Sequence, residues 1–273
     1  MPRQNLTHLR LPDRQYRVDL DPTSHFETLE AARNEDHLRA KMLLKYADSP
    51  ISPSKRRRAI QLASALSDEE TGARMASAVC KRDQRIRVFG SLCRICDRDS
   101  DDPSTFAVKS VALEIAGQDL RDVDPVALGK AFKADLHRAG AKGADGYLLA
   151  FLDGEYGPDR DVWKLHWHGL VDGKLKHVVD QLRKTRKYGQ PRDVWMSRKP
   201  LTNLPDALTY IDKPFWSSRW EGEVGRQAFK SRVKEPRHSE LLLWLDQHSS
   251  ADFSVRIGLE VINGELVKTH KNN

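Results

Sequence analysis

Residues 164–171 constrain the fold more than any other part of the chain, because their side chains alternate in type. The segment reads Lys-Leu-His-Trp-His-Gly-Leu-Val. Successive side chains of a β-strand point to opposite faces, so His166 and His168 would share one face, while Leu165 and Trp167 would share the other. Two adjacent neutral imidazoles suit a divalent metal better than an apolar core. The alternative is one histidine satisfied in the core and the other exposed.

Two acidic residues, Asp153 and Glu155, follow an apolar run at residues 149–152. If this run is also a strand, both carboxylates lie on one face. A hairpin would bring them within about 5 Å of the histidine strand. Either could then be the third metal ligand, leaving coordination positions open for a phosphate oxygen. The alternative for each acid is an ordinary polar hairpin end.

The rest of the pattern predicts an α+β protein with a central antiparallel sheet that carries the His-x-His strand, with helices on one face and a helical N-terminal region before it. Four strands are expected, at residues 106–115, 147–152, 165–171 and 194–196. Five helices are expected, at residues 26–45, 55–66, 124–140, 175–182 and 206–211.

The residue pattern divides the chain into four parts. They are a helical region at 1–75, a cysteine-containing segment at 76–102, the sheet-forming domain at 103–237, and a closing helix with a terminal strand pair at 238–273. No apolar run is long enough for a membrane span, and no signal-peptide pattern is present, so we expect a cytoplasmic protein.

Cys80, Cys93 and Cys96 are the only cysteines, and the last two form a Cys-x-x-Cys pair. The pattern is similar to a structural zinc site, in which Asp97, Asp99 or His37 would have to supply the fourth ligand. The alternative is three free thiols in a reduced compartment.

Positive charge is concentrated in one part of the chain. The net charge is +7, and residues 181–237 hold 14 Lys and Arg against six Asp and Glu. Such a segment suits a polyanion such as DNA, although a solvated basic face explains it equally well. Tryptophans among cations can stack on unpaired bases, though core packing is the commoner role. The candidate DNA-contacting residues are Arg183, Lys184, Arg186, Lys187, Trp216, Arg219 and Trp220.

Tyr210 and Lys213 follow the histidine pair by about forty residues. His166-Trp167-His168 followed by Tyr210-Ile211-Asp212-Lys213 resembles the HUH endonuclease superfamily, specifically rolling-circle replication initiators. Relaxases of that superfamily place the tyrosine before the histidines. The resemblance covers about half the chain and depends on the order and spacing of short motifs.

The resemblance implies a function and a set of roles. His166 and His168, with Glu155 or Asp153, would bind Mg²⁺ or Mn²⁺. Tyr210 would attack a DNA phosphate and form a 5′-phosphotyrosyl link, which permits later rejoining. Lys213, expected one helical turn beyond Tyr210, would stabilise the phenolate or the developing phosphate charge. The sequence has no second tyrosine shortly after Lys213, so a single-tyrosine enzyme is expected, with Tyr188 as the second-choice nucleophile.

The implied partners are single-stranded or hairpin DNA at a replication origin, of a plasmid or phage-like element, and a host helicase. A transposase of the same superfamily would share the site and its chemistry. A rival from another class is a non-catalytic DNA-binding regulator, in which the cysteine segment and the basic segment bind DNA and the histidines are structural. A zinc-dependent hydrolase would leave Tyr210 and Lys213 without a role.

Overall fold

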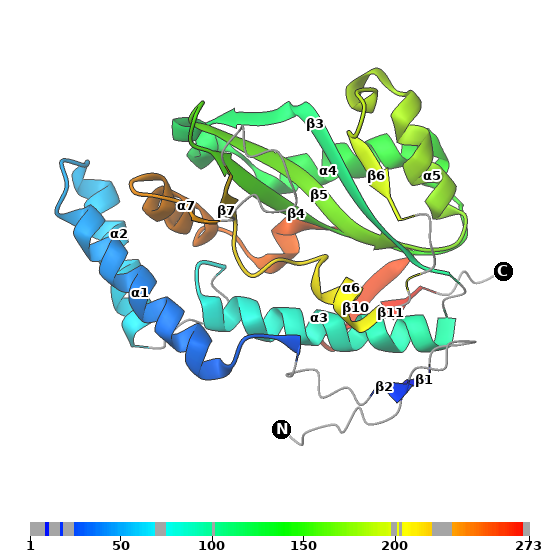
Figure 1. Cartoon of the computed structure of the whole chain (residues 1–273), viewed down its shortest axis with the longest axis horizontal. Coiled ribbons are helices and arrows are strands. Elements are labelled where there is room, and N and C mark those ends of the chain that lie inside the picture. Colours follow the sequence, from blue (N-terminus) through cyan, green and yellow to red (C-terminus); the bar gives the residue numbers. More distant parts are fainter. Residues whose placement is uncertain are drawn as a thin grey trace.

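The computed structural model describes residues 9–10, 17–18, 25–68, 75–99, 102–197, 201, 204–219 and 231–269. Among these residues, three α-helices lie in the N-terminal part of the chain, and a seven-stranded mixed sheet with further helices follows (Figure 1). The α+β class is therefore confirmed, as is the position of His166 and His168 on a strand. Within the described residues, no helix is both long enough and apolar enough to cross a membrane.

Two antiparallel helices, α1 (Leu29–Ala47) and α2 (Pro53–Ser67), lie side by side at one end of the molecule (Figure 1). Thr28 and Ser52 cap their N-termini by accepting hydrogen bonds from backbone N–H groups three residues later. Leucine and alanine side chains fill the space between the helices, together with Leu242 and Leu243 of helix α7 (Arg237–Leu245). The N-terminal helices therefore pack onto the C-terminal part of the chain.

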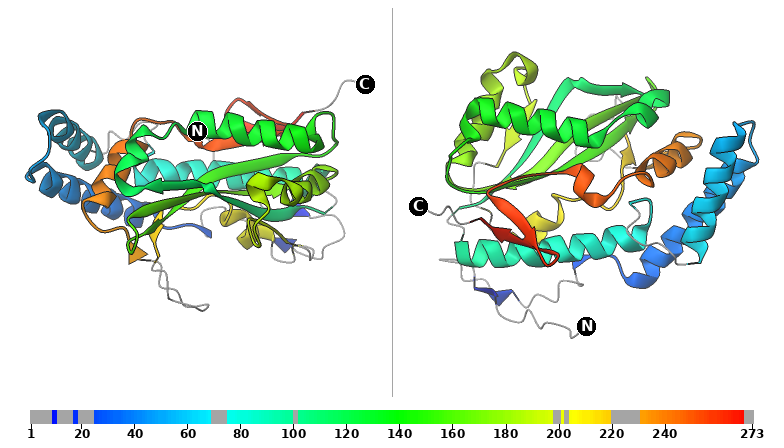
Figure 2. Two further views of the ribbon diagram at one scale, coloured as in Figure 1. Left: turned by 90° about the horizontal axis from the view of Figure 1, so that it is seen from above. Right: turned by 180° about the vertical axis from the view of Figure 1, so that it is seen from behind.

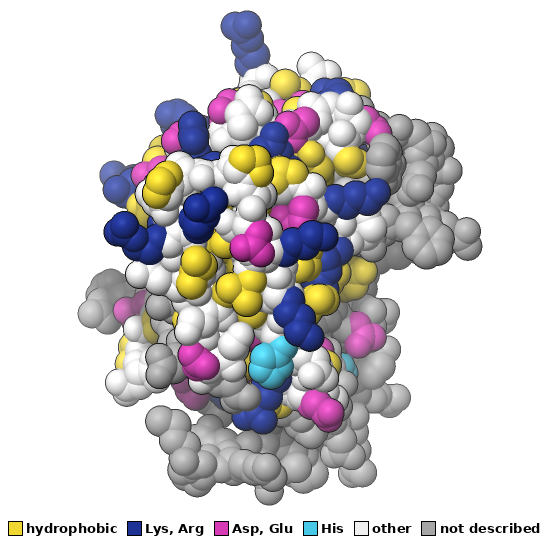
Figure 3. Space-filling view, turned by 90° about the vertical axis from the view of Figure 1, so that its left-hand side faces the viewer, with side chains coloured by type: hydrophobic (Ala, Val, Ile, Leu, Met, Phe, Trp, Pro, Cys, Tyr) yellow, Lys and Arg dark blue, Asp and Glu magenta, His cyan; other side chains and the backbone are white. Residues whose placement is uncertain are grey.

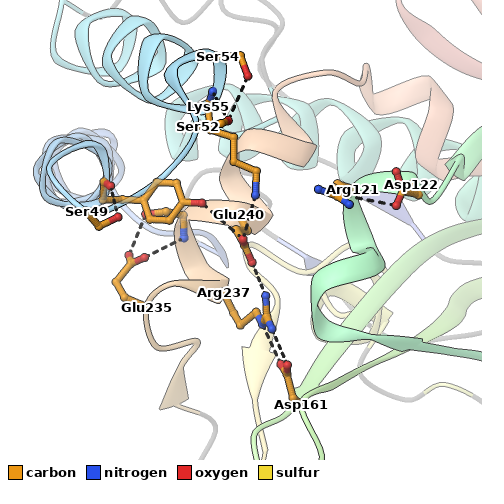
Figure 4. A network of polar contacts seen from close by, with 12 residues as sticks. Ser49, Ser52, Ser54, Lys55, Arg121, Asp122, Asp161, Glu235, Arg237 and Glu240 are labelled. Carbon is orange, nitrogen blue, oxygen red and sulfur yellow. Dashed lines mark hydrogen bonds and ion pairs between the residues drawn. The ribbon is translucent and has the colours of Figure 1, made fainter.

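Charged side chains reinforce this contact (Figure 4). Glu240 on α7 accepts hydrogen bonds from the Tyr46 hydroxyl and the Lys55 ammonium, both at 3.4 Å. Arg237 spans Glu240 and Asp161, which lies in the turn between strands β4 (Leu148–Gly157) and β5 (Val162–Val171). The network thus links both N-terminal helices to the hairpin that carries the histidines.

The main sheet has the strand order β6-β3-β5-β4-β7-β8, and β9 also pairs with β4. All pairs are antiparallel except β4 with β7, which makes the sheet mixed rather than wholly antiparallel as expected. The strands are β3 (Ser104–Ala116), β4 (Leu148–Gly157), β5 (Val162–Val171), β6 (Val194–Met196), β7 (Ser217–Ser218), β8 (Ser231–Arg232) and β9 (Ser254–Ile257).

Helices cover both faces of the sheet, whereas the sequence pattern predicted one. Helices α4 (Pro125–Leu136) and α5 (Leu175–Gln181) pack on the face that carries Trp167. Helix α3 (Ala78–Asp99) and helix α6 (Leu204–Thr209) pack on the opposite face, which carries Leu149 and Leu170.

Two strand pairs lie outside the main sheet. A hairpin of β10 (Leu259–Ile262) and β11 (Glu265–Lys268) lies against α3 (Figure 2). The short pair of β1 (Leu9–Arg10) and β2 (Arg17–Val18) lies near the N-terminus.

Candidate metal centre

The hairpin of β4 and β5 sets the geometry of the histidine pair. Its register places Asp153 opposite His166 and Phe151 opposite His168. Residues opposite one another in an antiparallel pair share a face, so the aspartate and both histidines project to the side that α3 partly covers. The turn is held by Asp161, which accepts hydrogen bonds from the Tyr156 hydroxyl at 2.7 Å and from Arg237. The turn therefore fixes the register that assembles the site.

Asp153, His166 and His168 form one compact group. A ligand atom from each residue lies within 4.8 Å of the other two. The Oδ2 atom of Asp153 is 3.2 Å from His166 Nε2 and 3.9 Å from His168 Nε2. His166 and Asp153 are buried, and about a quarter of the His168 side chain is exposed. The group therefore opens to solvent on the His168 side.

The orientation of His166 suits metal ligation. Its Nδ1 lies 3.1 Å from the backbone carbonyl of Lys164, which can only accept a hydrogen bond. The Nδ1 atom therefore carries a proton, and Nε2 faces the Asp153 carboxylate, 3.2 Å from its Oδ2 atom. The other carboxylate oxygen, Asp153 Oδ1, is buried and has no hydrogen-bond partner among the described residues. A metal ion bound here would pair with both the Nε2 atom and the carboxylate, and such carbonyl support is typical of metal-binding histidines.

The electrostatics of the group also suit metal ligation. Burial lowers the pKa of His168 to about 3, helped by the nearby His166 and Lys213, so its imidazole is neutral at physiological pH. Burial raises the pKa of Asp153, but the nearby His166, Lys213 and His168 lower it by more, so the pKa lies below its usual range. One carboxylate and a neutral imidazole are therefore ready to bind a divalent cation without losing a proton.

The segment that contains Tyr210 is attached directly to this group. Helix α6 ends at Thr209, so Tyr210 and Lys213 do not share a helical face as expected. The Lys213 ammonium instead forms an ion pair with Asp153. Ile211 is buried in the core beside α3, whereas the Tyr210 side chain is 66% exposed. The chain thus leaves an exposed phenol three residues from a lysine that touches the metal group.

Asp212, within this segment, is held by a polar stripe on α3 that sequence reasoning missed. Lys81 forms a buried ion pair with the Asp212 carboxylate. Gln84 donates to the same carboxylate at 3.3 Å, and Arg85 donates to the Asp212 carbonyl at 2.8 Å. The available signal was spacing: Lys81 and Arg85 continue, four residues apart, the buried stripe of α3 that includes Phe89 and Leu92.

Glu155, the other candidate third ligand, does not join the group. It lies two residues further along β4, opposite Lys164, and its carboxylate is 3.6 Å from Arg219. Asp153 is therefore the carboxylate that the register brings to the histidines. Arg219, a candidate DNA contact, lies beside the same strand with nearly half its side chain exposed.

The predicted zinc knuckle is wrong. Cys80, Cys93 and Cys96 all lie on the continuous helix α3. Thirteen residues of helix separate Cys80 from Cys93 by about 20 Å, whereas sulfurs bound to one zinc lie about 2.3 Å from it. Cys93 and Cys96 are buried in the core, and the three thiols form no disulfide. The Cys-x-x-Cys spacing is here part of the apolar stripe of a helix.

Two aromatic candidates also have structural roles. The Tyr188 hydroxyl is buried and donates to Asp135 at 2.6 Å, and burial together with that carboxylate raises its pKa far above the usual range. Tyr188 is therefore unsuited to be a nucleophile. The Trp216 ring packs against Trp163, Trp244 and Phe253, and a Cβ on Gly154 would collide with it. Trp216 is partly buried and packs against the core, and Trp220 lies outside the described residues.

The predicted basic cluster lies beside the sheet, away from the histidine face. Its 3-10 turns, Leu182–Lys184 and Arg186–Tyr188, pack near α4, where Lys187 pairs with Asp135. Arg183 pairs with Asp180 at 2.7 Å, and Lys184 and Arg186 are exposed. On the side where α1 and α2 lie, Lys and Arg are instead scattered among acidic and apolar side chains (Figure 3).

No model of a known protein family matches the chain, and no curated protein or solved structure shows significant similarity to it. Its capabilities are therefore inferred from its own geometry. That geometry provides a buried aspartate and two histidines, Asp153, His166 and His168, which could bind a metal ion.

Proposed function

We propose that this protein nicks and rejoins single-stranded DNA by a tyrosine transesterification of the HUH type. One observation carries the proposal: the segment of Tyr210 is attached through Lys213 to the group of Asp153, His166 and His168. Three residues of extended chain span at most about 11 Å, so the backbone of Tyr210 is held within that distance of the backbone of Lys213. The order of the motifs, with the histidines first, favours initiation of rolling-circle replication.

Asp153, His166 and His168 would hold Mg²⁺ or Mn²⁺. When bound, the ion would polarise the scissile phosphodiester and leave coordination positions for its oxygens. The partly exposed ring of His168 lies on the open side of the group, where a DNA phosphate can approach. Asp153 and His166 are almost fully buried.

Tyr210 would supply the nucleophile. The phenol loses its proton as its oxygen attacks the phosphorus, the bond from phosphorus to the 3′ oxygen breaks, and the 3′ oxygen takes up a proton and leaves as a hydroxyl. The 5′ phosphate remains bonded to the tyrosine. Attack by a 3′-hydroxyl on this link reverses the step and rejoins the strand, because the phosphodiester bond energy is conserved in the covalent intermediate.

Lys213 would place a positive charge between the nucleophile and the metal group. Its ammonium already pairs with Asp153, and the neighbouring Asp212 is fixed to α3. A lysine held in this way could stabilise the negative charge that develops on the phosphate. The same anchoring limits the movement of Tyr210, so that its hydroxyl searches a small volume.

The experiment is a covalent-adduct assay. The protein is incubated with single-stranded oligonucleotides from the DNA that flanks its gene, with Mn²⁺ or with EDTA, and separated on a denaturing gel. We expect a Mn²⁺-dependent protein–DNA adduct that Tyr210→Phe abolishes, while DNA binding is retained. Tyr188→Phe is the matched control and should still form the adduct. An adduct that persists in Tyr210→Phe would refute the assignment of the nucleophile, and metal-independent binding without any adduct would favour a non-catalytic regulator.

A further inference from the structure

Trp195 differs from the other tryptophans that the structure describes. Trp163, Trp167 and Trp244 are at most 1% exposed, and Trp216 packs into the core, but Trp195 is 53% exposed. It is the middle residue of β6, between Val194, which is buried, and Met196, which packs against the core. The alternation of the strand directs these two neighbours inward and the indole of Trp195 outward.

The register of the sheet places Trp195 in line with the metal group. Trp195 lies opposite Ala107 of β3, and Ala107 lies opposite His168 of β5. All three side chains are therefore on the same face. Two strand spacings separate Trp195 from His168, a distance of about 10 Å between their backbones. Ala107, which is buried, stands between them in this row.

A lysine borders the same row. Lys109 lies two residues beyond Ala107 on β3, opposite His166, and is exposed. The backbone of β3 is fixed to the segment before β6, because the Lys109 N–H donates to the Asp193 carbonyl at 2.6 Å. An exposed aromatic ring, a cation and the partly exposed metal group thus share one face of the sheet.

We propose that Trp195 is a positioning residue that stacks on an unpaired base of the strand whose phosphate lies at the metal group. A flat indole beside a cation is the usual surface for unpaired bases, because every base offers a π-face and every nucleotide a phosphate. Lys109 would contact the phosphate between the stacked base and the scissile position. This inference deepens the proposed function and rests on it for the identity of the strand as DNA.

The test is DNA binding without metal. A fluorescein-labelled oligothymidylate of about 16 nucleotides is titrated with the full chain in EDTA, and anisotropy reports the dissociation constant. The free energy of stacking on one base predicts that Trp195→Ala weakens binding about tenfold. Trp195→Phe keeps an aromatic ring and should retain most of the affinity. Ile60→Ala is the matched control, since Ile60 is a 46% exposed apolar residue on α2 at the other end of the molecule. It should bind as the parent does.

Unchanged affinity of Trp195→Ala, with an unchanged unfolding temperature, would overturn the inference, as would a failure of the parent to bind the oligothymidylate. An equal loss of affinity for a duplex of the same length would also overturn it, because paired bases are not free to stack on the ring. Trp195-dependent binding without any covalent adduct would leave the stacking residue in place and refute the nicking reaction. An adduct at Tyr210 with Trp195-independent binding would do the reverse.

Discussion

The two faces of the β4–β5 hairpin are built from alternate residues of the same two strands, yet they are stabilised in different ways. On one face Trp167 stacks on Phe132 of α4, with ring centroids 4.9 Å apart and planes within 7°. On the other, His166 and Asp153 are buried almost as completely as Trp167. Apolar side chains need only a packed neighbour, whereas buried polar atoms need a partner for each lone pair and charge. The comparison shows that equal burial is consistent with a stabilising role on one face and a ligand-binding role on the other.

The largest effect should come from the apolar face. Replacing Trp167 with alanine would remove the ring that packs on Phe132 and leave a cavity, which should lower the free energy of unfolding by about 4 kcal/mol. Chemical denaturation monitored by circular dichroism measures this change. The folded fraction should still bind Mn²⁺ with the affinity of the parent. A loss below about 1 kcal/mol would show that the two faces do not differ as described.

A somewhat smaller loss should follow from unpairing a charge on the site face. Lys81→Met removes the ammonium that pairs with the buried Asp212 carboxylate, so unfolding free energy should fall by about 3 kcal/mol. Denaturation curves of Lys81→Met and of the double variant Lys81→Met with Asp212→Asn test the cause. The double variant should recover part of the loss, because no unpaired charge remains. If it is less stable than the single variant, the charge is not the reason.

The third prediction distinguishes the two acids of β4. Asp153→Asn should weaken Mn²⁺ binding by about 100-fold, since it removes a charged ligand of the group. Glu155→Gln is the matched control, because Glu155 lies on the same strand and face but beside Arg219. Its affinity should stay within about twofold of the parent in isothermal titration calorimetry. A larger effect of Glu155→Gln than of Asp153→Asn would reverse the assignment.

The smallest change in stability is expected for Glu35 on α1, and this change depends on pH. Burial raises the pKa of Glu35, but ion pairs with Arg232 and Arg39 more than offset this and lower it to about 2, from an ordinary value of 4.5. Because the pKa is lower in the folded state, the added stability is present above about pH 4.5 and is lost as the pH falls toward 2. Glu35→Gln should therefore be about 2 kcal/mol less stable than the parent at neutral pH, and the gap should close with acidification.

Urea denaturation of both proteins across this pH range measures the gap. A constant difference at all pH values would contradict the role of the charge. The apolar face should not contribute to any pH dependence, so Trp167→Ala should show the same acid transition as the parent, displaced to lower stability.

Much of the site could be predicted from the sequence, because the side-chain alternation within each strand is a local feature. The alternation around His166 and His168 predicts their common face, and it also places Asp153 and Glu155 together. The choice between the two acids was left open, because it depends on the register of the hairpin. That register is set by the turn at Asp161, which is held by Arg237 from a helix 76 residues away.

Features that depend on distant segments could not be predicted. The pairing of Lys81 with Asp212 joins positions 131 residues apart, and no local pattern indicates it. The cysteines were misinterpreted because a spacing of three residues is common to a zinc knuckle and to one face of a helix. The second covered face of the sheet was missed for a related reason: residues 76–102 were interpreted as a cysteine segment, whereas they contain helix α3, which packs on that face.

The proposed function requires that Asp153, His166 and His168 hold one divalent ion. Titration of the apo protein with Mn²⁺, followed by the electron paramagnetic resonance signal of the free ion, measures this directly. We expect one equivalent to bind per chain, and we expect the double variant His166→Ala, His168→Ala to bind none at the same concentrations while remaining folded. Undiminished binding by the double variant, or no binding by the parent, would contradict the account.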